Sequence, residues 1–136
     1  MLIREFISEA NKSQMITTLL KHYKVGNVRV KLKSMKNHAH YNVDTGTLEL
    51  STKYKTIKNS QVKEFLITIL HEINHAMDAK MFGWKKFKYM YEYEMNLQIA
   101  NDKDEYKDNK FEIQAEEFGQ KMWKYWKTKF KKQDLI

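Results

Sequence analysis

Hydrophobic residues recur at helical spacing in the first stretch of the chain. Between residues 3 and 23 the spacing is that of one helical face, which predicts an amphipathic helix starting near Ile3. The apolar positions of that face are Phe6, Met15, Leu19 and Leu20. Gly26 then ends the pattern, as glycine commonly does.

Apolar and polar residues alternate in the next stretch, which indicates strands. The alternating apolar positions are Val28, Val30 and Leu32 in a first run and Leu48 and Leu50 in a last run. A second extended run covers residues 39–43, and Asp44-Thr45-Gly46 after it forms a typical turn sequence. We therefore expect a small antiparallel sheet of about three strands.

The most apolar segment of the chain begins near Ser60, where the spacing returns to that of a helix. Ser60 is a suitable N-cap, and Gly83 is a suitable end. The apolar stripe between them consists of Val62, Phe65, Leu66, Ile69, Leu70, Ile73, Ala76 and Met77. A helix with so broad an apolar face is expected to lie at the centre of the fold.

Two more helices are predicted after Gly83, at residues 84–99 and 110–131, with a charged loop at 101–109 between them. The apolar face of the last helix consists of Phe111, Ala115, Phe118, Met122, Trp126 and Phe130. The whole pattern predicts the α+β class: an N-terminal helix, the small sheet, a central helix and C-terminal helices. A length of 136 residues fits a single domain, residues 1–136.

Composition supports a globular protein and restricts its chemistry. Hydrophobic residues make up 42% of the chain, and cysteine is absent. A disulfide framework and a thiolate metal site are therefore excluded, and a metal would be bound by His, Asp or Glu. The first residues lack the layout of a secretory signal, and no apolar run approaches the roughly 20 residues that cross a bilayer. We expect a cytoplasmic protein with no membrane partner.

The net charge of +8 has two interpretations. The first is a solvated, lysine-rich surface. The second is affinity for nucleic acid or another polyanion, although no nucleic-acid-binding motif accompanies the charge. The candidate basic face consists of Lys121, Lys124, Lys127, Lys129, Lys131 and Lys132, interleaved with Trp123, Trp126 and Phe130.

Two histidines on the predicted central helix have the spacing of a metal site. They lie in the sequence His71-Glu72-Ile73-Asn74-His75, which places both imidazoles on one helical face, one turn apart. Two ring nitrogens can then bind one zinc ion. Glu72 lies beside that ion, where it can accept a proton from water and pass it to a leaving amine. The alternative is that both histidines are core-edge residues hydrogen-bonded to neighbours.

A catalytic zinc site commonly has three protein ligands and one open position. No histidine follows His75, so the third ligand is sought among carboxylates of the last helix. Glu112 is preferred because it borders the apolar face, where a carboxylate needs a partner. Glu116, one turn further, could accept a hydrogen bond from a ligand histidine. Glu116 and Glu117 are alternative ligands, and Glu112 and Glu116 could instead be solvated carboxylates paired with lysines.

The two halves of this constellation resemble the motifs of gluzincin metallopeptidases, most closely the ImmA/IrrE-like peptidases and related phage and bacterial proteins. There a His-Glu-x-x-His helix precedes a helix reading Glu-x-x-Ala-x-x-Phe-small, which matches Glu112 to Gly119 here. The resemblance covers roughly residues 1–122. It implies a zincin-like fold, with His71, His75 and Glu112 as zinc ligands, Glu72 as general base and Glu116 as an outer-shell carboxylate. The chain departs from the pattern at Asn74, at Glu116 and in the long stretch between the halves.

The resemblance implies a zinc-dependent metallopeptidase of phage or mobile-element type, an endopeptidase rather than an exopeptidase, acting on peptide or protein substrates. Side chains that could polarise the scissile carbonyl are Tyr89, Tyr91, Tyr93, Tyr106, His38 and His40. An extended substrate could add to a strand edge at residues 39–43 or 48–51. The alternative function is a zinc-binding, peptidase-like domain without proteolytic activity that binds a partner or nucleic acid.

Overall fold

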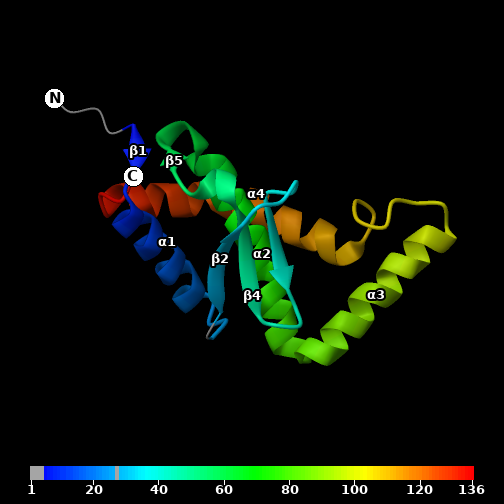
Figure 1. Ribbon diagram of the computed structural model, residues 1–136. Coiled ribbons are helices and arrows are strands. Elements are labelled where there is room, and N and C mark those ends of the chain that lie inside the picture. The colour runs from blue at the N-terminus through cyan, green and yellow to red at the C-terminus, as the bar shows by residue number, and fades with distance from the viewer. Residues whose placement is uncertain (1–4, 27) are drawn as a thin grey trace.

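Helices and two small sheets make up the computed structural model, which describes residues 5–26 and 28–136, and the three-stranded sheet lies against the central helix (Figure 1). The helices are α1 (Glu9–His22), α2 (Val62–Phe82), α3 (Trp84–Ala100) and α4 (Lys110–Lys132). The strands are β1 (Phe6–Ile7), β2 (Arg29–Lys33), β3 (Ala39–Asn42), β4 (Thr47–Ser51) and β5 (Ile57–Lys58), and 3₁₀ turns occupy Thr52–Tyr54 and Asn59–Gln61. The predicted α+β class is confirmed.

The first helix is shorter than its hydrophobic pattern predicts. α1 begins at Glu9, and the hydroxyl of Ser8 caps it by accepting a hydrogen bond from the Asn11 backbone N–H at 3.1 Å. Phe6 lies in β1, which pairs with β5, so the prediction of a helix at Phe6 is wrong. The predicted start at Ile3 lies outside the described residues. The serine cap decides the helix start because it satisfies a backbone donor that the helix leaves free.

The three-stranded sheet has the order β2-β4-β3, and the prediction that it is antiparallel is wrong for one pairing. β3 and β4 form the expected antiparallel hairpin, whereas β2 and β4 are parallel. β4 is central because Leu48 and Leu50 are both buried, while β2 is mostly exposed. A central β4 has no free edge, so residues 48–51 are not available to an added strand. β3 is an edge strand.

The N-cap of the central helix lies one residue after the predicted cap, Ser60. Ser60 lies in a 3₁₀ turn, and the predicted N-cap role of Ser60 is wrong, since α2 starts after Gln61 without a side-chain cap. Instead, the side-chain oxygen of Gln61 accepts a hydrogen bond from the Lys58 backbone N–H at 2.9 Å. Gly83 ends α2 with φ of 85°, as predicted, because glycine tolerates a positive φ.

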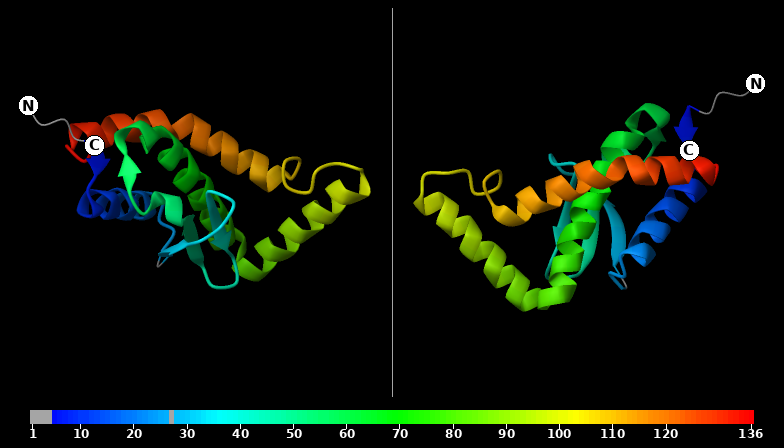
Figure 2. Two further views of the ribbon diagram at one scale, coloured as in Figure 1. Left: turned by 45° about the horizontal axis from the view of Figure 1, so that its top comes forward. Right: turned by 180° about the vertical axis from the view of Figure 1, so that it is seen from behind.

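α2 and α4 cross closely, as Figures 1 and 2 show. Phe65 and Ile69 of α2 and Trp126 and Phe130 of α4 are fully buried in one hydrophobic core. At the crossing, a Cβ atom on Gly119 would lie 2.7 Å from the backbone carbonyl oxygen of α2 residue Ile67. The absence of a side chain at Gly119 therefore sets how near the two helices approach.

Replacing Gly119→Ala is expected to destabilise the protein by about 1–3 kcal/mol, because the Ile67 carbonyl belongs to a helix backbone and cannot move aside. In a helix interior without such a contact, the same change would stabilise by about 0.5–1 kcal/mol. Urea unfolding of both variants measures the difference. Lys121→Ala, at an exposed position of the same helix, is the matched control. A stabilised Gly119→Ala protein would contradict the close crossing.

α3 leaves the end of α2 and projects away from the sheets, and the chain then returns through the 101–109 loop to α4 (Figure 2). We call α3, this loop and the first turns of α4 the arm. The arm brings the start of α4 beside the second half of α2. In this way two segments that are distant in sequence are placed next to each other.

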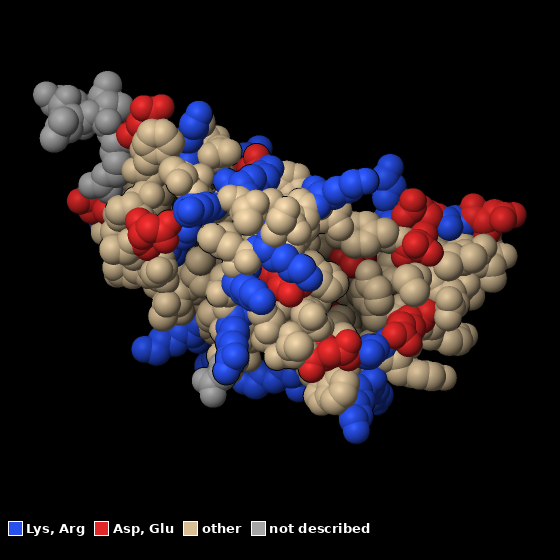
Figure 3. All heavy atoms as spheres, viewed as in Figure 1, with Lys and Arg blue, Asp and Glu red and all other residues tan. Residues whose placement is uncertain are grey.

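Most lysines of the candidate basic face are exposed, but two of its aromatic residues lie in the core. Trp126 and Phe130 are core residues, and the half-buried Trp123 ring lies 4.8 Å from the Lys63 ammonium. Figure 3 shows Lys and Arg spread over one face of the protein, while acidic side chains gather over the loop that joins α3 to α4. Binding of nucleic acid or another polyanion by this surface stays a prediction. None of the described helices combines the length and hydropathy needed to cross a membrane.

Candidate metal centre

Three buried side chains from two helices converge where α2 and α4 cross. His71 and His75 lie one turn apart on α2, and Glu112 reaches them from the first turn of α4. One carboxylate oxygen of Glu112, Oε1, lies 2.8 Å from Nε2 of each histidine. The candidate ligand atoms of the three residues all lie within 4.8 Å of one another. Two imidazole nitrogens and a carboxylate oxygen at one point could hold a metal ion.

Charge coupling within the cluster favours an ionised Glu112. Burial raises the pKa of Glu112, but hydrogen bonds from His71 and His75 outweigh it and hold that pKa well below its usual range. Burial lowers the pKa of His71, but the nearby Glu112 and Glu72 outweigh it and raise that pKa to about 9. Glu112 is therefore an anion at neutral pH, as a carboxylate metal ligand must be.

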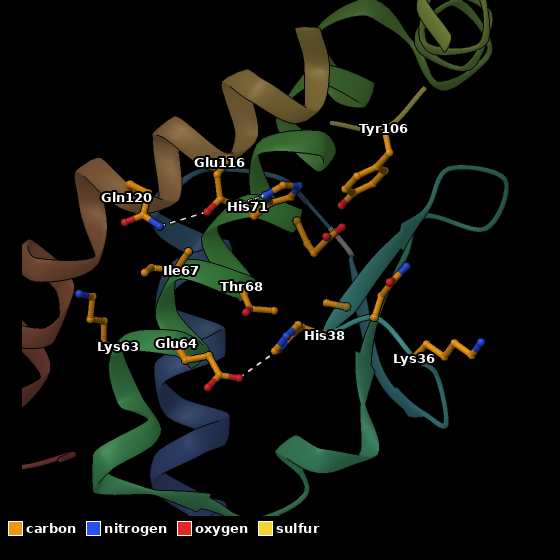
Figure 4. A pocket seen from close by; sticks show the side chains of 13 residues that line it. Lys36, His38, Lys63, Glu64, Ile67, Thr68, His71, Tyr106, Glu116 and Gln120 are labelled. Atoms are coloured by element: carbon orange, nitrogen blue, oxygen red, sulfur yellow. Dashed lines mark hydrogen bonds and ion pairs between the residues drawn. The ribbon is translucent and has the colours of Figure 1, made fainter. Parts of the chain in front are cut away.

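Two residues hold the cluster from outside. Glu116 Oε2 lies 3.0 Å from Nδ1 of His71, and Gln120 donates to the other Glu116 oxygen at 3.1 Å (Figure 4). This contact favours the tautomer with a proton on Nδ1, which leaves Nε2 of His71 free as a ligand atom. From α3, the Tyr91 hydroxyl donates a hydrogen bond to Glu112 Oε2. Glu117, an alternative ligand from the sequence, is exposed and outside the cluster.

Glu72 lies beside the cluster without belonging to it. Its side chain is buried, and burial raises its pKa, opposed by the charges of His75 and His71. A carboxyl group whose pKa is raised toward neutrality accepts and releases protons more readily at working pH. This is the environment that a general base requires.

Two cavities meet at Glu72, and both are also lined by Asn37, Ala39 and Tyr106. One cavity, of about 680 Å³, extends along α2 toward its start. The other, of about 380 Å³, extends toward the arm, where Phe87 and Met95 line it. Glu72 therefore stands at the middle of a continuous cleft that follows β3.

His38 lies in the bend just before β3 and His40 lies in β3, so the expectation from their spacing that both belong to one strand is wrong, and the two histidines line different cavities. His38 lines the larger one, where its Nδ1 lies 2.9 Å from the Tyr54 hydroxyl and 3.0 Å from Glu64 Oε1 (Figure 4). The Tyr54 hydroxyl also donates to Glu64 at 2.8 Å. His40 lines the smaller cavity. His38 thus belongs to a polar cluster at the far end of the cleft, one to two helical turns from His71.

Among the candidate tyrosines, Tyr91 and Tyr106 line the cleft, and both hydroxyls interact with Glu112. Tyr89 and Tyr93 are 71% and 61% exposed on the outer side of α3 and line neither cavity. Tyr106 comes from the 101–109 loop, and its ring points into the cleft opposite His71 (Figure 4). The loop is held in shape by Asp104, whose carboxylate accepts from the Tyr106 backbone N–H at 2.8 Å.

Sequence reasoning missed two polar residues near the cluster, Asp78 and Asn109. Asn109 is fully buried and caps α4 by accepting from the Phe111 N–H at 2.9 Å. Asp78 lies three residues after His75; burial raises the pKa of Asp78, and the charge of His75 opposes that rise. The signal in the sequence was the spacing of Asp78, which puts it on the helical face of the ligands.

Comparison of the chain with protein-family models, curated proteins and solved structures finds no match. The interpretation of the metal centre therefore stands on its residues and geometry.

Proposed function

We propose that this protein is a zinc-dependent peptidase of the gluzincin type, with Glu72 as its general base. The observation that carries the proposal is the convergence of His71, His75 and Glu112 beside the buried Glu72. Two histidines and one glutamate are a ligand set that catalytic zinc takes in peptidases, and the fourth position is left for water or substrate. The cleft on both sides of Glu72 provides room for a chain that passes the metal.

Different residues around the cleft have different roles in hydrolysis. Zinc held by the three ligands would lower the pKa of water toward about 7 and polarise the scissile carbonyl. Glu72 takes a proton as the water oxygen bonds to the carbonyl carbon. It then delivers that proton to the amine nitrogen as the C–N bond breaks. The Tyr106 hydroxyl is a neutral donor for the carbonyl oxygen.

The edge strand β3 is the proposed docking line for substrate. β3 pairs only with β4 among the described strands, so its other edge carries free backbone donors and acceptors. Ala39 of β3 lines both cavities, so this edge runs along the cleft. An extended peptide can add to such an edge by backbone hydrogen bonds. This geometry supports cleavage within a chain, which is endopeptidase activity.

Metal removal tests the proposal. The purified protein is expected to contain close to one zinc per chain by elemental analysis and to cleave members of an unstructured peptide library followed by mass spectrometry. A chelator should abolish cleavage and added zinc should restore it. Zinc binding without cleavage of any library member would favour the alternative, a peptidase-like binding domain. A protein with no affinity for zinc would overturn the proposal.

A further inference from the structure

Three buried side-chain atoms lack a hydrogen-bond partner within the described residues: His75 Nδ1, Asp78 Oδ2 and Asn109 Nδ2. A buried polar atom without a partner destabilises the fold, so each one calls for an explanation. When His75 binds a metal through Nε2, its Nδ1 carries the proton and is a donor. Asn109 Nδ2 is a donor as well, and Asp78 Oδ2 is an acceptor. The three atoms are therefore chemically complementary.

The register of the two crossing helices indicates which residues of α2 and α4 lie opposite one another. Ile67 of α2 lies against Gly119 of α4, and His71 lies 3.0 Å from Glu116. One turn further along α2, His75 lies 2.8 Å from Glu112. Each turn forward along α2 thus moves about one turn back along α4, as in antiparallel helices.

If this register continues by one more turn, Asp78 on α2 lies opposite Asn109 at the start of α4. Their neighbours support the pairing, because Ala79 and Phe111 pack together with Phe87 in one buried cluster. The Asn109 side chain is also fixed in orientation, since its oxygen caps α4 through the Phe111 N–H. Its amide nitrogen is therefore held in the buried interior, and the register makes Asp78 Oδ2 a candidate acceptor for it.

We propose that Asp78 is a positioning residue of the metal centre: in the metal-bound protein its carboxylate accepts hydrogen bonds from Nδ1–H of His75 and from the side-chain amide of Asn109, two donors that have no partner within the part of the chain that the structure describes. The inference rests on the proposed metal site. Asp78 holds His75 in the tautomer that leaves Nε2 free, and through Asn109 it is linked to the cap of the helix that carries Glu112. Each histidine then has its own carboxylate, Glu116 for His71 and Asp78 for His75.

Zinc affinity, measured on the full chain by competition with a chromophoric chelator, tests the inference. Asp78→Ala is expected to weaken zinc binding about 10- to 100-fold, as loss of an outer carboxylate typically does. Asn109→Ser keeps a capping oxygen but removes the amide donor, so it should weaken binding less. The double variant should lose no more than Asp78→Ala alone, because both changes break one network. Asn74→Ala, a half-buried polar position of the same helix, is the matched control.

Two spectroscopic measurements separate positioning from mere structural support. The cobalt-substituted protein should change its visible absorption in Asp78→Ala, and the Nδ1 proton of His75, visible by NMR in the zinc form, should be lost. Asp78→Asn, which keeps the shape and one acceptor, should fall between parent and Asp78→Ala and covers the case in which the alanine variant fails to fold. Zinc affinity and Nδ1 proton signal equal to the parent's would overturn the inference alone. A parent protein that binds no zinc would overturn the proposed function and the inference with it.

Discussion

Replacing Glu72→Gln is expected to abolish peptide hydrolysis while leaving zinc content unchanged. Glutamine has nearly the shape of glutamate but cannot take a proton from water, and Glu72 is not one of the three clustered ligand residues. Positioned general-base catalysis contributes about 10²- to 10⁴-fold, so kcat should fall by about that factor. Burial raises the pKa of Glu72, so a neutral amide at this position should not destabilise the fold.

The measurement is kcat on a peptide taken from the library, together with zinc per chain by elemental analysis. Glu117→Gln is the matched control, because Glu117 is an exposed carboxylate outside the cluster and should change neither quantity. Hydrolysis by Glu72→Gln at the parent's rate would remove Glu72 from the mechanism. Loss of zinc in the same variant would instead make Glu72 part of the metal site.

Replacing Glu112→Ala is expected to lower zinc affinity by more than about 100-fold, beyond the loss from an outer-shell residue. Glu112 is the carboxylate that meets both histidines at 2.8 Å, and its side chain is only 8% exposed. In the metal-free protein the same change leaves His71 and His75 without their shared partner. Breaking a buried ion pair in this way costs about 3–5 kcal/mol. Zinc competition measures the first effect, and urea unfolding in the presence of a chelator measures the second.

Matched carboxylate variants on α4 identify the third ligand. Glu116→Ala should weaken zinc binding by about 10- to 100-fold through His71, and Glu117→Ala should leave it unchanged. If Glu112→Ala binds zinc like the parent while Glu116→Ala or Glu117→Ala does not, the third ligand is one of these alternatives. The ranking of the three variants by zinc affinity therefore identifies which of the three carboxylates is the third ligand.

Features that depend on local spacing could be read from the chain alone. The positions of His71 and His75 on one helical face follow from a helical period, which is a local property of the backbone. The ends of α2 and α3 near Gly83 follow from the freedom of glycine to adopt a positive φ. Where a local cap competed with the pattern, as at Ser8, the predicted boundary was displaced.

Features that depend on which segments meet were decided by tertiary packing. Alternation along β2 could not show that it runs parallel to β4, because pairing direction is a relation between strands. Helical spacing in α4 placed Glu112 near an apolar face, but the crossing at Gly119 sets the register that brings it to the two histidines. Tertiary packing also buries Asn109 fully and Asp78 in part. The chain by itself thus determined the local presentation of the two histidines and of Glu72. Tertiary packing decided the partners of that face, because contacts between distant segments depend on how whole helices fit together.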